Sequence, residues 1–164
     1  MNPLQIALID DDASFCEMVK DHIAKKIPDS VVTVYPTGET ALAALQTSPD
    51  IVILDYQLDS VQADAMNGIQ VLTKLKDRYP DLPVVFMSSQ DRMEVATNTI
   101  KYGAYDYITK SETAFQRLEL GITNLAERGK LKKSNGVQKT MNIVFWSLLA
   151  IWIVYSLYLR FTAS

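Results

Sequence analysis

Five short apolar runs alternate with segments of helical pattern along the first 128 residues, and this alternation restricts the fold more than any other feature. The apolar runs cover residues 4–9, 31–35, 51–54, 83–87 and 105–109. The segments between and after them repeat apolar residues at intervals of three and four, and cover 13–27, 37–46, 69–79, 91–102 and 112–128. Strands that alternate with helices in this way predict an α/β fold, a doubly wound (βα)5 parallel sheet of five strands with helices on both faces.

Polar residues stand directly after four of the five predicted strands. They are Asp10, Asp11 and Asp12 after the first strand, Asp55 after the third, Ser88 and Ser89 after the fourth, and Lys110 after the fifth. Right-handed crossovers bring the carboxyl ends of parallel strands to one edge of the sheet, and ligands of such folds bind at that edge. We therefore expect these side chains to form one polar cluster, although they are far apart in the sequence.

The residue types in this cluster favour phosphoryl chemistry with a hard metal ion. Neighbouring carboxylates repel one another unless a cation joins them, and oxygen-only ligands suit Mg²⁺. Lys110 supplies a compact positive charge for a phosphate oxygen, and a carboxylate can itself become an aspartyl-phosphate. Cys16 and His22 are the only residues of their types, which excludes a disulfide framework or a Cys/His zinc cluster within the chain. No glycine-rich phosphate loop occurs, so nucleotide binding is disfavoured, and His22 is predicted to be a surface histidine away from the cluster.

Five sequence pieces resemble the receiver domain of two-component response regulators. They are LIDDD at 8–12, DIVILD at 50–55, NG at 67–68, LPVVFMSS at 82–89 and GAYDYITK at 103–110. The pieces occur in the order and spacing of the family, and the resemblance covers about 1–128. It implies the flavodoxin-like form of the α/β fold.

The resemblance also implies a metal site. Asp55 would be the phosphoacceptor and would share a Mg²⁺ ion with Asp11, a direct ligand. Asp10 would hold the ion through water, and the backbone carbonyl of Gln57 would be a further ligand.

The remaining implied roles concern the phosphoryl group and the response to it. Ser88 would donate a hydrogen bond to a phosphoryl oxygen, and Lys110 would pair with the same group. Tyr107 stands at the aromatic switch position, which turns inward when Ser88 moves; a static, packed tyrosine is the alternative. A receiver catalyses only its own phosphorylation and dephosphorylation, so the chain is not expected to be an enzyme in the usual sense.

The sequence departs from the family pattern at two places. Ser111 stands where the family usually has a proline after a cis peptide bond, and a non-proline cis bond costs about 3 kcal/mol. The loop 56–67 is about five residues longer than is common, and it is a neutral insertion, a shield for the acceptor or a segment that selects a partner. Gln57 and Gln90 flank the acceptor region and could orient a hydrolytic water. Three neighbouring residues are given structural roles: Asp12 as a loop acid or a helix N-cap, Ser89, and Cys16 as a core thiol.

The composition changes abruptly after Glu127. All 19 acidic residues lie at or before it, where ten Lys and Arg leave a net charge of −9, whereas the remainder carries six Lys and Arg and no acid. From Thr140 to Leu159 no residue is charged, and 20 residues at about 1.5 Å per residue match the hydrocarbon thickness of a bilayer. We predict a receiver domain over 1–128, a basic linker over 129–140, a transmembrane helix over 141–161 and a short tail over 162–164.

Alternatives to the transmembrane helix are an interfacial or oligomerising helix, or a buried helix of a soluble core. A core helix normally shows a polar stripe, which this segment lacks. Five basic residues precede the segment, namely Arg128, Lys130, Lys132, Lys133 and Lys139, and only Arg160 follows it. The excess of positive charge before the helix predicts a single-pass protein of the bacterial cytoplasmic membrane, with its N-terminal domain in the cytoplasm.

The expected function is that of a phosphoacceptor in a two-component phosphorelay, with a histidine kinase or histidine phosphotransfer protein as donor. The linker has no room for a helix-turn-helix module, so the output is expected to be a downstream protein partner and not nucleic acid. A non-phosphorylated adaptor that uses the receiver fold to dock partners at the membrane is the alternative. An aspartyl-phosphate hydrolase would need a second aspartate two residues after the nucleophile, where Gln57 stands.

Overall fold

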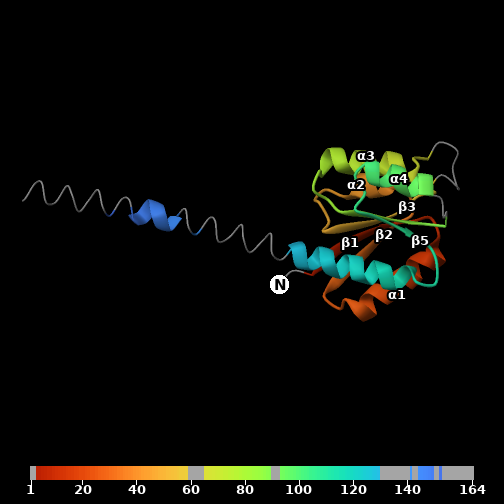
Figure 1. The fold of residues 1–164 in the computed structure, drawn as a ribbon, viewed down its shortest axis with the longest axis horizontal. Coiled ribbons are helices and arrows are strands. Elements are labelled where there is room, and N and C mark those ends of the chain that lie inside the picture. Colours follow the sequence, from red (N-terminus) through yellow and green to blue (C-terminus); the bar gives the residue numbers. More distant parts are fainter. Residues whose placement is uncertain are drawn as a thin grey trace, which may run out of the picture. The chain divides into compact units, whose positions relative to one another are not determined.

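Five parallel strands form one sheet in the computed structural model, which describes residues 3–58, 65–89, 93–129, 141, 144–149 and 152. The elements are β1 (Leu4–Ile9), α1 (Ala13–Lys26), β2 (Ser30–Tyr35), α2 (Gly38–Ala44), β3 (Ile51–Asp55), α3 (Gly68–Arg78), β4 (Val84–Ser88), α4 (Met93–Lys101) and β5 (Asp106–Thr109), and a further helix covers 114–129. The strand order is β2-β1-β3-β4-β5, with every neighbouring pair parallel (Figure 1). The predicted α/β fold is confirmed, and the predicted ends that fall on described residues differ from the observed ones by at most two residues.

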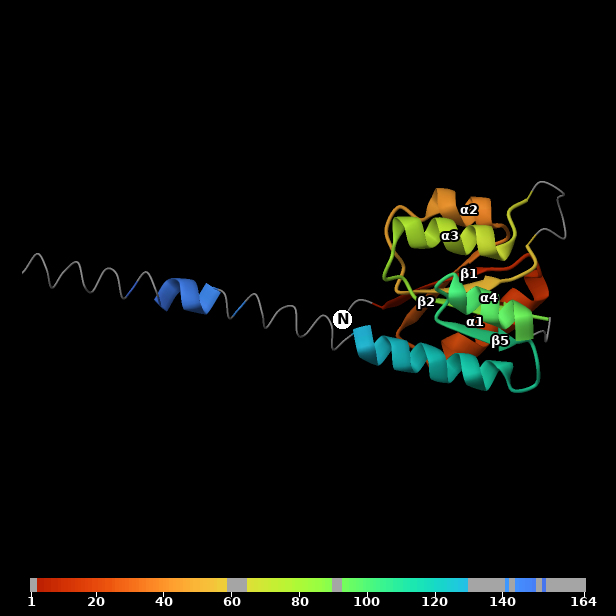
Figure 2. The same ribbon diagram turned by 45° about the horizontal axis from the view of Figure 1, so that its top comes forward.

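Two layers of helices cover the two faces of the sheet (Figure 2). The α2, α3 and α4 helices pack on one face, and α1 with the helix over 114–129 packs on the other. Successive side chains of a strand point to opposite faces, so Ala7 and Ile9 of β1 join the first layer while Ile6 and Leu8 join the second. The central strands β3 and β4 are buried along their whole length, as their continuous apolar runs predict.

Polar side chains fix the beginnings of three helices at the edge of the sheet where the strands end. The Asp12 carboxylate accepts hydrogen bonds from the backbone N–H groups of Ser14 and Phe15 at 2.9 and 3.1 Å, which confirms its predicted role as the N-cap of α1. Thr37 and Asn67 begin α2 and α3 with capping boxes, in which the side chain three residues later bonds back to the cap. These caps define where the chain leaves each strand and enters the next helix.

The chain forms two compact units, Met1–Ala126 and Glu127–Ser164. In the second unit the described residues 144–149 are helical, and Ser147 Oγ donates to the carbonyl of Val144 at 2.8 Å. None of the helices in the described part of the chain is long and apolar enough to span a bilayer. Most of the predicted span 141–161, all of the predicted linker except residue 129, and the tail 162–164 lie outside the described residues.

Candidate functional site

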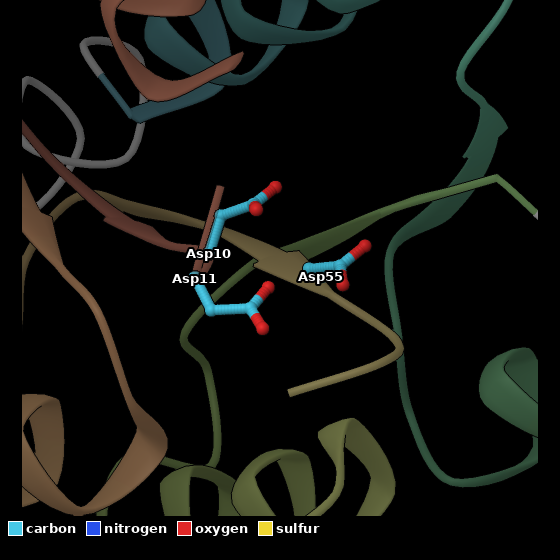
Figure 3. A group of neighbouring side chains, drawn as sticks. All are labelled: Asp10, Asp11 and Asp55. Atoms are coloured by element: carbon cyan, nitrogen blue, oxygen red, sulfur yellow. The ribbon is translucent and has the colours of Figure 1, made fainter. Parts of the chain in front are cut away.

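Three carboxylates meet at the carboxyl edge of the sheet. Asp10 follows β1, Asp11 comes next, and Asp55 ends the neighbouring strand β3; Figure 3 shows their side chains side by side. One oxygen of each lies within 4.8 Å of the others. Asp10 and Asp55 are only 2% and 5% exposed, and Asp11 is half-buried. The topology therefore concentrates negative charge in a place where little water is present to offset it.

The Lys110 ammonium joins two of these carboxylates. Its Nζ lies 2.7 Å from Asp10 Oδ2 and 3.1 Å from Asp55 Oδ1, and its side chain is 17% exposed. The backbone N–H of Lys110 donates to the carbonyl of Ser88 at 2.8 Å, which continues the pairing of β5 with β4 as far as the site. A residue at the end of the last strand thus reaches across to the first and third strands.

Burial and the opposite charge of the partner shift the pKa of Asp55, and likewise that of Lys110, in opposite directions. Burial raises the pKa of the Asp55 carboxyl above its usual value, and the nearby Lys110 charge offsets only part of this effect. Burial by itself would lower the pKa of Lys110, but the hydrogen bond to Asp10 and the charges of Asp55 and Asp10 outweigh it, so the pKa of Lys110 is raised. One ammonium therefore does not fully compensate the carboxylates around it.

The donor set fits a hard divalent cation. The three side chains offer only carboxylate oxygens, which Mg²⁺ prefers, and Lys110 supplies one positive charge against three acids. Asp10, Asp11 and Asp55 are the described residues that could hold such an ion. The backbone N–H of Gln57 donates to Asp55 Oδ2 at 3.0 Å and orients the acceptor carboxylate, while the role of its carbonyl as a ligand stays a prediction.

Ser88 and Tyr107 lie on the two strands that complete this edge. Ser88 ends β4 and is fully buried, and its register partner in β5 is Thr109. Tyr107 is buried in β5, where it pairs in register with Phe86, and its carbonyl accepts a 3.3 Å hydrogen bond from Arg117. The structure thus places Ser88 at the site edge and packs Tyr107 into the core beside it.

Comparison with known proteins identifies the family. Residues 6–120 match the family model of the response regulator receiver domain. The chain belongs to this family. A putative NtrX-like response regulator of Rickettsia conorii is 33% identical over 138 residues, which is 82% of this chain, and the transcriptional regulatory protein DegU of Brevibacillus brevis is 32% identical over 119 residues, 72% of this chain. The matched regions make up 27% and 48% of those two relatives, so the chain spans less than half of the length of either.

Solved receiver domains have the same fold. The receiver domain of NtrX from Brucella abortus superposes with a TM-score of 0.65 at 28% identity, covering 74% of this chain and 98% of that chain. The receiver domain of the Francisella response regulator 1452 has a TM-score of 0.66 at 24% identity and covers 78% and 99% of the two chains, which shows the fold alone.

Three residues near the receiver site, Ser111, Cys16 and Ser89, can be compared with the smaller predictions. No peptide bond between described residues is cis, so Lys110–Ser111 is trans, without the cis bond that usually precedes proline there. Cys16 is buried, as predicted; burial raises the pKa of its thiol to about 11, and Sγ donates to the carbonyl of Asp10 at 3.5 Å. Ser89 is exposed, and Gln90 lies outside the described residues, as do residues 59–64 of the long loop.

The interpretation of His22 as a surface histidine needs correction. Its side chain is 25% exposed, and its ring lies 5.2 Å from the ring of Phe115 on the helix over 114–129. Its Nε2 lies 3.3 Å from a carboxylate oxygen of Glu119 but lacks the alignment of a hydrogen bond. The lysines near His22 in the sequence suggest that its side chain faces solvent, whereas the helix over 114–129 covers one side of the ring.

Three residues that support the receiver site were not predicted. Phe15 places its ring 4.1 Å from Lys110 Nζ. Gly68 packs so closely that a Cβ atom there would lie 2.6 Å from the carbonyl oxygen of Asp55. Glu39 accepts a 2.7 Å hydrogen bond from the backbone N–H of Met66, near the end of the long loop, and this bond lowers the pKa of Glu39. Of these three residues, only Gly68 is marked by a motif in the sequence, as part of the NG pair at 67–68.

Proposed function

We propose that the chain accepts a phosphoryl group on Asp55 from the phosphohistidine of a histidine kinase or histidine phosphotransfer protein, as one step of a two-component phosphorelay. The observation that supports this most directly is the bridge formed by Lys110 between Asp10 and Asp55, at 2.7 and 3.1 Å. A buried carboxylate held by an ammonium, beside two further acids, has the parts that phosphoryl transfer to an aspartate requires.

In the proposed reaction, a carboxylate oxygen of Asp55 attacks phosphorus, an O–P bond forms, and the P–N bond to the donor imidazole breaks. The electron pair of that bond returns to the imidazole nitrogen, which takes up a proton. Lys110 exchanges its contact with Asp55 Oδ1 for one with a phosphoryl oxygen and keeps its contact with Asp10. The N–H of Gln57 holds Asp55 Oδ2 in place during the attack. A Mg²⁺ ion bound by Asp10, Asp11 and Asp55 would neutralise charge on the transferring group.

The proposed output is a change in a protein-binding surface. Ser88 moves toward the phosphoryl group, and Tyr107 and the β5 segment respond to this movement. The net charge of −9 over residues 1–127 repels nucleic acid, which supports a protein partner. The relative DegU is described as a transcriptional regulatory protein, so nucleic acid binding by the full chain is a result that would contradict this part of the proposal.

We further propose that residues 141–161 anchor the protein in the bacterial cytoplasmic membrane, with the receiver in the cytoplasm. The support comes from the sequence, in the uncharged stretch from Thr140 to Leu159 and the basic residues before it. The full chain should stay with the membrane fraction after extraction at alkaline pH, while a chain ending at residue 139 should not. Release of the full chain into the soluble fraction would contradict the anchor and leave the receiver proposal intact.

The phosphoacceptor is tested with the full chain, Mg²⁺ and acetyl phosphate as the donor. We expect one phosphoryl group on the wild type by intact mass, and none on Asp55→Asn. Asp12→Asn is the matched control, because asparagine is an equally good N-cap and Asp12 lies outside the proposed ligand set, so it should be phosphorylated like the wild type. Phosphorylation of Asp55→Asn would overturn the assignment. A wild type that takes up no phosphoryl group and binds no beryllofluoride would favour the adaptor function.

A further inference from the structure

Lys110 contacts an aromatic ring in addition to the two carboxylates and the backbone of the sheet. Its Nζ lies 4.1 Å from the centroid of the Phe15 ring, within the range of a cation–π interaction. Phe15 is in the first turn of α1 and is 8% exposed. The Asp12 carboxylate accepts a 3.1 Å hydrogen bond from the backbone N–H of Phe15, which fixes the position of the backbone that carries the ring. Its burial and the cap therefore hold the Phe15 ring in a fixed position beside the Lys110 ammonium.

The aromatic ring holds the ammonium without offering it a competing acceptor atom. A carboxylate or carbonyl in the same place would form a hydrogen bond that Lys110 must break before it could reach a phosphoryl oxygen. The ring attracts the charge through its quadrupole, and this attraction is stronger where water is scarce. Lysine also has a long stem with many rotamers, and a ring beside the stem reduces the number that it can adopt.

We infer that Phe15 is a positioning residue for Lys110, whose ring keeps the ammonium between Asp10 and Asp55 so that it is in place when the phosphoryl group arrives. The last step of this inference rests on the proposed phosphoacceptor function. The placement of the ammonium by the ring does not depend on it, and the two can be tested separately.

The competing explanation is that Phe15 is only a core residue. It packs in the cluster formed by α1, the helix over 114–129 and the face of the sheet that they cover, where Cys16, Val19 and Ile108 are also buried. Phe115 provides a comparison within the same layer. Its ring lies 6.0 Å from that of Phe15 and 5.2 Å from that of His22, so its removal disturbs the same packing.

The first experiment measures binding of beryllofluoride with Mg²⁺, a phosphoryl mimic, to the full chain in detergent. We expect Phe15→Leu to weaken binding about three- to tenfold, which is the size of a partly desolvated cation–π contact. Phe15→Tyr keeps the ring and should restore binding to near the wild-type level, and Phe115→Leu should change it less than about twofold. Equal losses in Phe15→Leu and Phe115→Leu would overturn the inference, because packing would then explain both.

Two further measurements distinguish the electrostatic effect of the Phe15 ring from the effect of its size, and test the placement of Lys110 separately from the proposed phosphoacceptor function. Fluorinated phenylalanines at position 15 weaken the ring quadrupole with little change of shape, and beryllofluoride affinity should fall with each added fluorine; a constant affinity would contradict the inference. The Lys110 ε-protons should show an upfield ring-current shift in the NMR spectrum of the wild type, and this shift should be lost in Phe15→Leu. If the wild type binds no beryllofluoride, the phosphoacceptor proposal fails, and the ring-current shift alone decides whether Phe15 places the lysine.

Discussion

The two sides of the receiver site are held in different ways. On one side, Asp10, Phe15 and Lys110 meet through a charge pair and a ring contact between side chains. On the other side, the chain around Asp55 is held by its backbone: the N–H of Gly68 donates to the carbonyl of Tyr56 at 3.1 Å, and Gly68 packs against the Asp55 carbonyl. Side-chain charge contacts can exchange one anion for another, whereas backbone contacts fix the path of the chain. We therefore expect the side that carries Lys110 to adapt when an anion binds, and the side that carries Asp55 to stay rigid.

The largest effect is expected on the rigid side, from Gly68→Ala. A Cβ atom at this position would lie 2.6 Å from the Asp55 carbonyl oxygen and 2.9 Å from a ring carbon of Phe86, so backbone would have to move. We expect the free energy of unfolding to fall by about 3 kcal/mol, measured by urea denaturation. Gly121→Ala is the control, because a Cβ there meets nothing within 4 Å and alanine favours the helix. A fully stable Gly68→Ala would show that this side of the site adapts as well.

An intermediate effect of opposite sign is expected from Asp55→Asn. Burial raises the pKa of the Asp55 carboxyl, so its ionised form is less favourable in the folded than in the unfolded chain. At pH 7, without Mg²⁺, the variant should be more stable than the wild type by about 1 kcal/mol. The gain should be complete above the folded pKa and disappear as the pH falls below the unfolded pKa, where the carboxyl is neutral in both states.

The same denaturation series with saturating Mg²⁺ checks the charge argument. The ion should stabilise the wild type and have little effect on Asp55→Asn, which lacks one of its ligands. Lower stability of Asp55→Asn without metal would mean that the Lys110 pair outweighs burial, and would contradict the balance of charges described for this site.

The smallest effect is expected from Glu39→Gln on α2, where Glu39 accepts a hydrogen bond from the backbone N–H of Met66. Glu39 is exposed, so the loss at pH 7 should be only about half a kcal/mol. The hydrogen bond from Met66 lowers the pKa of Glu39, and a lowered folded pKa gives stability above the unfolded pKa that is lost as the pH falls through the folded one. The difference between wild type and variant should therefore vanish in acid.

The fold and the charged part of the site were predictable because they follow from local pattern and from one topological rule. Each strand is an apolar run, four of the five runs are followed by a polar residue, and parallel connections bring those residues to one edge. The supporting contacts could not be predicted in the same way. Phe15 belongs to the apolar stripe of α1, and nothing in its spacing shows that the end of β5 would bring Lys110 to its ring. Glu39 bonds to a backbone N–H, a partner that leaves no trace in the residue type of Met66.

The bridge from Lys110 to Asp10 joins residues 100 positions apart in the sequence. The carboxylates at the ends of β1 and β3 come together early along the chain, but the cation that joins them is supplied only after β5, the last strand of the sheet. During synthesis, a ribosome must therefore have released almost the whole domain before the acidic site can close. A product that terminates between residues 55 and 110 therefore carries the acceptor aspartate without the lysine that the proposed reaction requires.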